Sequence, residues 1–249
     1  MNLLKDSIED NFENFYNSST ICINDVLNNN NKFKISHFKE SYSRLVSLQA
    51  WRTSIIEVEH QSGAIDFFKE AHNDALMSHI LARQGAWRVA LSSLRSCIEN
   101  TLFGLYYLDH SVEMQLWEAG RHKLGFTEVV NYIIAHPHFH DITENLTGIS
   151  QIKKEYALLS KAVHGSSEIF RMTKTGEIEG LNIFSEPDLG AWSTRESLTI
   201  INLNKILIVF FKNYLQGTAN SNLRKSLSIA IPPKYYPDIR RLFGVNLRP

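Results

Sequence analysis

The sequence has 249 residues, 43% of them hydrophobic, which is enough for one substantial core. Lysine plus arginine balances aspartate plus glutamate at 26 each, so no bulk field draws the whole molecule to nucleic acid or membrane. The two cysteines, Cys22 and Cys97, form no C-x-x-C pair, which disfavours a disulfide framework or a cysteine zinc site and indicates a reducing compartment.

The N-terminus is acidic at Asp6, Glu9 and Asp10, where a signal peptide would be basic. The longest apolar run, residues 206–211, is far shorter than the ~20 residues that span a bilayer. These features predict a soluble, cytoplasmic chain with no membrane partner. The nearest approach to a local basic patch lies near the C-terminus and consists of Arg224, Lys225, Lys234, Arg240, Arg241 and Arg248.

Helical periodicity dominates the N-terminal part of the chain. Residues 3–16 are typical of a short amphipathic helix, and the asparagines at 28–31 of a loop. Ser36 is suited to cap the next helix, which we expect to run to about His60 and to stop at Gly63. Its expected inward positions are Leu45, Leu48, Ile55 and Ile56.

The middle of the chain predicts a bundle. One helix is expected from about Ala64 to Arg83, and the next, from about Ala86 to Leu108, is apolar on several faces, as in the centre of a bundle. Residues 111–120 and 126–137 predict two shorter helices, the second ended by its proline, and residues 151–164 predict another. In the expected helix from Ala64 to Arg83, the buried stripe is predicted to consist of Ile65, Phe68, Ala75, Leu76 and Ile80.

The last third begins with residues 169–184, which alternate around a Thr-Gly turn and favour a small β-hairpin. The clearest helix is 192–217, where Ser193 and Glu196 suit a capping box and Gly217 a C-terminal stop. Without repeats or long linkers, the chain is predicted to be an all-α, single-domain multi-helix bundle. Its parts are N-terminal helices (1–60), a core (61–217) and an irregular basic tail (218–249).

Two of these helices carry candidate functional side chains. Arg95 and Glu99 are four residues apart on one helix face, and Arg88 lies on the same polar edge. A charge in the middle of a core helix must be paired and hydrogen-bonded. Three interpretations are open. Arg95 and Glu99 form a structural ion pair, or Arg95 is an active-site residue that holds a phosphate, or the pair belongs to a partner interface.

His164 ends the predicted helix 151–164, and Ser160 and Lys161 lie beside it. The helix dipole stabilises a cation at this end, so the ring has a structural role even without any other. The alternative is a general acid or base, because histidine titrates near neutral pH and can exchange a proton with a ribose hydroxyl.

The motifs SLRSCIEN and YALLSKAVHG resemble uncharacterised bacterial proteins of the HEPN-like helical class, over roughly residues 60–215. The resemblance implies a helical bundle that often dimerises, and many such proteins are metal-independent ribonucleases of toxin–antitoxin or phage-defence systems. Their usual signature is an arginine followed four to six residues later by a histidine on one helix. His164 matches that histidine, but Leu158, Leu159 and Ser160 occupy the arginine positions, so Arg95 would have to come from the neighbouring helix.

The resemblance leads to one functional prediction, an endoribonuclease that acts at a homodimer cleft without metal or cofactor. Arg95 would hold the scissile phosphate, Glu99 would orient Arg95, and His164 would act as acid or base. The residues expected to bind the RNA are Lys161, Arg88 and Ser160.

Two alternatives stay open. One is a non-catalytic helical adaptor for a partner protein encoded nearby, and the other is a small-ligand sensor in the bundle core. His136, His138 and His140 alternate as metal ligands might, or belong to a plain loop. Phosphate-binding loops, the nucleophile elbow and the H-E-x-x-H zinc motif are absent from the sequence.

Overall fold

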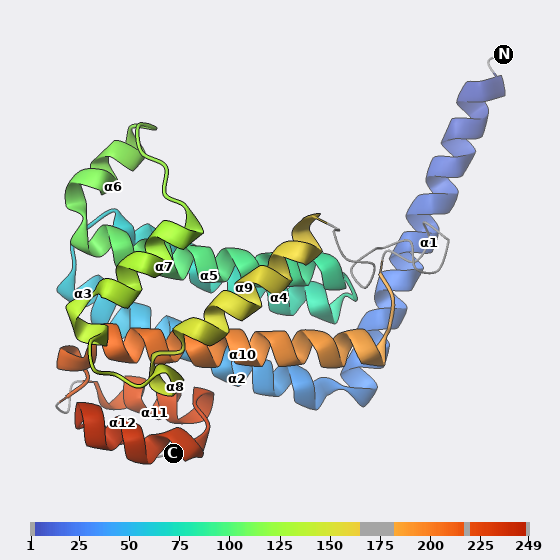
Figure 1. Cartoon of the computed structure of the whole chain (residues 1–249). Helices are drawn as coiled ribbons and strands as arrows, with labels where there is room; N and C mark the ends of the chain where they lie inside the picture. The colour runs from blue at the N-terminus through green and yellow to red at the C-terminus, as the bar shows by residue number, and fades with distance from the viewer. Residues whose placement is uncertain (1–2, 165–181, 217–219, 248–249) are drawn as a thin grey trace.

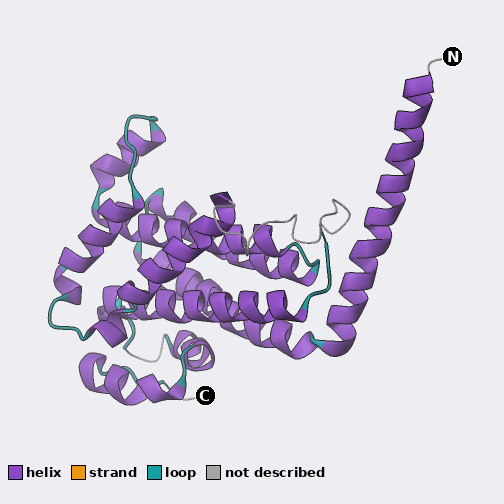
Figure 2. Ribbon diagram, turned by 45° about the vertical axis from the view of Figure 1, so that its right-hand side comes forward, coloured by secondary structure: helices purple, strands orange, loops and turns teal. Residues whose placement is uncertain are grey.

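The computed structural model describes residues 3–164, 182–216 and 220–247, and within these ranges the chain is an all-α multi-helix bundle without strands (Figures 1 and 2). The hairpin expected at 169–184 lies outside the described residues except for 182–184, which are not strand. No helix in the described ranges is long and apolar enough to cross a membrane.

Helix α1 (Leu3–Phe33) is continuous, so the short helix at 3–16 and the loop at 28–31 were wrong. The buried Asn30 side chain donates a hydrogen bond to the Arg83 carbonyl at 2.9 Å, and Arg83 donates to the Asn31 side chain at 3.0 Å. These tertiary bonds override the low helix propensity of asparagine. Only the base of α1 packs on the body, and the rest projects away from it (Figure 1).

Helix α2 (Ile35–Trp51) continues through a π-helical segment, η1 (Arg52–Ile56), into α3 (Glu57–Glu59). The expected end near His60 is confirmed, and the four expected inward positions are buried. The expected cap was wrong. Ser36 lies inside the first turn because the chain re-enters a helix directly after α1, with Lys34 at the N-cap. Gly63 is the N-cap of the following helix and does not end this one.

Helices α4 (Ala64–Arg83) and α5 (Trp87–Asp109) form a tight hairpin, and their bounds confirm the sequence expectation to within a residue. Helix α5 is central and packs against α4, α7, α9 and α10. The predicted stripe of α4 is confirmed only in part, because Phe68 and Ala75 are buried as expected. Ile80 is 46% exposed, whereas Phe67, Ala71 and Ser78 are buried.

The short helices α6 (Ser111–Glu118) and α7 (Phe126–Ala135) follow, and α7 ends just before Pro137 as expected. After η2 (Pro137–Phe139) and α8 (Glu144–Thr147) comes α9 (Ile149–His164), which lies against α5 and α10. The predicted helix 151–164 is therefore confirmed over its length, and the residues that follow His164 lie outside the described residues.

Helix α10 (Glu186–Phe210) begins well before the predicted capping box. Ser185 is its N-cap, and its hydroxyl accepts a hydrogen bond from the Asp188 amide at 3.2 Å. The box at Ser193 and Glu196 was wrong because Glu196 lies inside the helix, where its side chain is buried against Arg44 of α2. Gly217 lies outside the described residues.

The tail was predicted to be irregular, and this was wrong. It holds α11 (Ser221–Ala230), η6 (Pro233–Tyr235) and α12 (Tyr236–Phe243), preceded by η5 (Lys212–Tyr214). Pro232, Pro233 and Pro237 fall between helices or in a first turn, where a missing amide proton costs nothing. Helix α11 packs on α2, and the core is continuous with the tail through Leu223, Leu227, Ile239, Phe243, Val245 and Leu247.

Candidate functional site

The antiparallel packing of α5 on α9 gathers the first group of predicted site residues. Arg95 Nε donates to Ser160 Oγ at 3.1 Å, and Arg95 Nη1 donates to Glu99 Oε2 at 3.0 Å. Arg95 Nη2 donates to the Tyr156 hydroxyl at 2.6 Å, and that hydroxyl donates to Glu99 Oε1 at 2.8 Å. Arg95, Glu99 and Ser160 therefore meet, as the motifs suggested.

Tyr156 is the member of this cluster that the sequence did not single out. Its ring stacks on Phe126 at the start of α7, with the ring planes 6° apart, and the Arg95 guanidinium carbon lies 4.8 Å from the ring centroid. Burial and the bond to Glu99 raise the pKa of its hydroxyl. The available signal was its spacing of four residues before Ser160 on α9.

Each of the three guanidinium nitrogens of Arg95 donates a hydrogen bond to a side chain of this chain. The side chains of Arg95 and Glu99 are both only 22% exposed. A half-buried pair with this many bonds holds α5 and α9 in register, and its charge is already paired with the Glu99 carboxylate.

Arg88 is occupied in a different way. Its Nε donates to the Ala162 carbonyl at 2.8 Å, and its Nη2 donates to the Val163 carbonyl at 3.0 Å. Both carbonyls belong to the last described turn of α9. Arg88 therefore ties this turn of α9 to α5.

His164 and Lys161 lie in the last turn of α9 and are exposed. Neither side chain makes a hydrogen bond or an ion pair with the described residues. Ser160, which does contact Arg95, lies one helical turn before His164. The imidazole thus shares a side of α9 with the cluster but is not bonded to it within the described residues.

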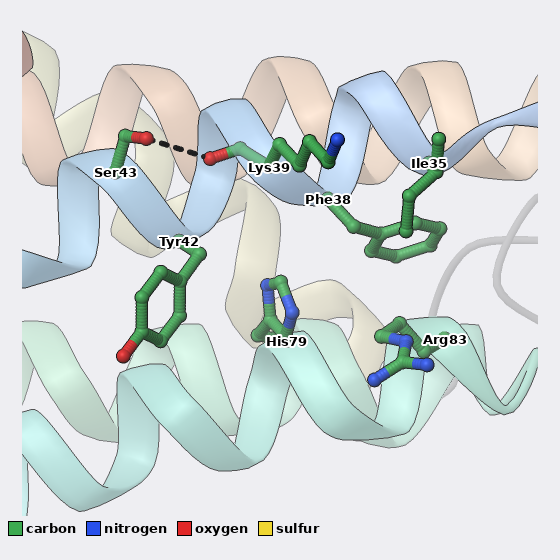
Figure 3. A pocket seen from close by; sticks show the side chains of 7 residues that line it. All are labelled: Ile35, Phe38, Lys39, Tyr42, Ser43, His79 and Arg83. Atoms are coloured by element: carbon green, nitrogen blue, oxygen red, sulfur yellow. Dashed lines mark hydrogen bonds between the residues drawn. The ribbon is translucent and has the colours of Figure 1, made fainter. Parts of the chain in front are cut away.

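A second candidate site is the α2–α4 groove, a hollow of about 410 Å³ that is open to solvent (Figure 3). Helix α2 provides apolar ring and aliphatic surface, and α4 provides His79 and Arg83 one turn apart. No sequence motif marks this site, because its residues come from two separate helices. The groove is lined by Ile35, Phe38, Lys39, Tyr42, Ser43, His79 and Arg83.

His79 lies at the base of the groove and is only 8% exposed. Its Nδ1 is 3.1 Å from the Ser41 hydroxyl, and its ring makes edge contacts with Phe38, Tyr42 and Trp192. Burial, with help from the nearby Arg83 charge, lowers the pKa of His79 to about 4. The ring is therefore neutral at neutral pH, and its Nε2 has no partner among the described residues.

The edges of the groove are positive. Arg83 uses Nη2 to bond the Asn31 side chain, but its buried Nε has no hydrogen-bond partner within the described ranges. Lys39 is exposed, and its ammonium pairs with no acid of the described residues. Since no acid lines the groove, it combines apolar walls with two cations that lack a carboxylate partner.

Behind the groove, α2 and α10 are joined by a buried ion pair. Arg44 Nε donates to Glu196 Oε2 at 3.0 Å, and the Glu196 side chain is 1% exposed. Burial raises the pKa of Glu196 to about 7, although Arg44 and the nearby Ser41 hydroxyl favour its charged form. This pair fixes the helix that carries one wall of the groove.

The three alternating histidines point to different partners. His136 Nε2 is 3.2 Å from Asp109 Oδ2, and His138 Nδ1 is 2.8 Å from the Phe210 carbonyl. The exposed His140 lies beside Asp141. Nowhere in the described ranges are three histidine, cysteine or acidic side chains grouped so that they could hold a metal ion.

Comparison with known proteins gives no relative. No protein-family model matches the sequence, and neither a curated protein nor a solved structure matches it.

Proposed function

We propose that the chain is a non-catalytic helical adaptor that binds a partner polypeptide in the α2–α4 groove. The observation that supports this most strongly is the pairing of apolar walls with two cations that have no carboxylate partner. Such a groove is complementary to an apolar side chain next to an acidic one, with the carboxylate placed between Lys39 and Arg83.

The shape of the groove favours a polypeptide over an enclosed small molecule. Sites for small molecules surround most of the ligand surface, whereas this groove is open to solvent. A hollow of about 410 Å³ has room for one or two side chains of a passing chain. His79 Nε2 adds one neutral hydrogen-bonding group for the backbone or an adjacent polar atom.

The ribonuclease is the second candidate. It is favoured by the meeting of Arg95, Glu99 and Ser160, with His164 one turn further along α9. The Arg95 charge is already paired with Glu99, and no bond joins His164 to the cluster within the described residues, which favours the adaptor, because general acid–base catalysis needs both groups within reach of one reacting phosphate. The bacterial defence or toxin–antitoxin setting rests on the motif resemblance and belongs to this proposal in either case.

The test is calorimetric titration with two matched probes, Ac-Phe-Asp-NH2 and Ac-Phe-Asn-NH2. We expect the acidic peptide to bind more tightly, and Arg83→Gln or Lys39→Gln to weaken that binding by about tenfold or more. Arg240→Gln, which removes an exposed arginine on α12, is the matched control and should change nothing. Equal binding of both peptides, or equal loss in all three variants, would exclude the groove as the binding site.

A further inference from the structure

The N-terminal arm, residues 6–22 of α1, carries an apolar stripe that the body does not cover. Ile8, Phe12 and Phe15 are 58%, 65% and 54% exposed, and Tyr16 beside them is 62% exposed. Their spacing alternates between four and three residues and continues through Ser19 and Cys22 to Val26. This is the spacing of a coiled-coil seam.

The same stripe is buried at the base of α1. Val26 is 4% exposed and Asn30 is fully buried, where α1 meets α2 and α4. At 100° per residue, Val26 points in the same direction as Ile8. One face of α1 is therefore covered by the body at its base and uncovered along the arm (Figures 1 and 2).

A projecting helix of this length is marginally stable in water, and most helical stability comes from packing an apolar face. A second helix laid along the stripe would supply that packing. The acids Asp6, Asp10 and Glu13 lie on the far side of the arm, so they do not obstruct the stripe.

We infer that the second helix is the arm of another copy of this chain, paired antiparallel. The orientation follows from the body, which occupies the stripe side of α1 at Val26 and Asn30. A parallel pair would bring both bodies to the same end and the same side, where they collide. An antiparallel pair places the two bodies at opposite ends of the paired arms.

The stripe is self-complementary in this orientation. Phe12 falls opposite Phe15 of the partner subunit, and Ile8 falls opposite Ser19 of the partner subunit. In each layer, one of the two alternating seam positions of one helix faces the other seam position of its partner, as in antiparallel coiled coils. The layers next to the central aromatic pairs set a large side chain against a small one.

The flanks of the seam agree with this pairing. Glu9 falls beside Tyr16 of the partner subunit, whose hydroxyl can donate to the carboxylate, and Asn11 falls beside Ser18 of the partner subunit. No two like charges face each other, so nothing electrostatic opposes self-association. The inference uses a different surface from the proposed function, and the two stand or fall separately.

Cysteine cross-linking on the full chain reads out the orientation. In a Cys22→Ser background, we compare Ser19→Cys alone with Ile8→Cys plus Ser19→Cys under mild oxidation. Antiparallel arms place position 8 of one copy opposite position 19 of the other, so only the double variant cross-links between chains. The two cysteines of one chain lie about 16 Å apart on one helix and cannot pair with each other. Cys97 is fully buried and does not compete. Cross-linking of Ser19→Cys alone would show a parallel pair and overturn the orientation, and no cross-linking would overturn the pairing.

Light scattering over a wide concentration range reads out the association itself. We expect a reversible dimer whose dissociation constant rises at least about a hundredfold in Phe12→Ser plus Phe15→Ser. Ile21→Ser is the matched control, because Ile21 is 60% exposed on the opposite face of the arm and should not affect the dimer. A monomer at every concentration, even one that binds some added helical peptide, would overturn the inference, as would a dimer that survives loss of both phenylalanines.

Discussion

At the scale of single residues, burial and bonding decide which polar side chains remain available to a ligand. Arg95 lies on a prominent motif, yet each guanidinium nitrogen is bonded within the chain. Arg83 belongs to no motif, yet its Nε is left without a partner among the described residues. The motif therefore marks an arginine that joins α5 to α9, and no motif marks the arginine that lines the groove.

Removal of Arg95 should chiefly destabilise the fold. Arg95→Ala leaves the half-buried Glu99 carboxylate without its cation, so we expect the free energy of unfolding to fall by about 2–4 kcal/mol in urea titrations. Glu99→Gln in the same chain should restore part of this loss. Arg241→Ala, which breaks an exposed pair with Asp238, is the control and should cost less than about 1 kcal/mol. Equal losses in both variants would contradict a structural role for Arg95.

His79 should make stability depend on pH. Its pKa falls from 6.5 to about 4 on folding, so the unfolded chain binds this proton more tightly. The stability it contributes is complete above pH 6.5 and is lost as the pH falls toward 4. Glu196 acts oppositely, because burial raises its pKa from 4.5 to about 7 and its contribution is lost as the pH rises through that range.

The His79 contribution can be isolated by comparing the parent with His79→Gln, since Glu196 is present in both. We expect the stability advantage of the parent over the variant to shrink between pH 7 and pH 4 in urea unfolding. An advantage that stays constant over this range would show that His79 has the same pKa in the folded and unfolded chain.

At the scale of helices, long-range bonds extend elements beyond the limits that local propensity sets. Asn30→Ala improves helix propensity but removes the bond to the Arg83 carbonyl. We expect faster amide hydrogen exchange at the base of α1 and a loss of about 1 kcal/mol of stability. Asn28→Ala, at an exposed position of the same helix, should leave exchange unchanged or slow it. Slower exchange in both variants would mean that propensity alone holds this segment.

The same contrast between local pattern and long-range contact decides which helices could be predicted from the sequence. Periodic apolar faces located α5, α7 and α9 closely, because those helices bury the side that the pattern marks, whereas for α4 the pattern located the bounds but only part of the buried face. The predicted start of α10 failed because Glu196 matched a capping pattern but pairs with Arg44 on a distant part of the chain. The tail failed because its prolines fall where helices tolerate them.

At the scale of the whole molecule, only part of the candidate site was visible in the sequence. The two motifs supply Arg95, Glu99 and Ser160, which lie in contact in the structure, but the expected catalytic set also included His164, which has no bond to Arg95. The α2–α4 groove was invisible, because two helices far apart in the sequence each supply an unremarkable set of residues. The projecting stripe of α1 was hidden by the expectation of a loop at 28–31.

The adaptor proposal places partner binding in the α2–α4 groove and no reaction at the Arg95 cluster, and one histidine reports on each of these two surfaces. His79 lies in the α2–α4 groove, and His164 lies beside the Arg95 cluster. The most direct measurement is the ¹H–¹³C spectrum of the imidazole rings while Ac-Phe-Asp-NH2 or a short single-stranded RNA is added. We expect the peptide to shift the His79 resonance and leave His164 unmoved, and the RNA to shift neither. RNA-dependent shifts of His164 with an unmoved His79 in the peptide titration would contradict the adaptor and favour the ribonuclease.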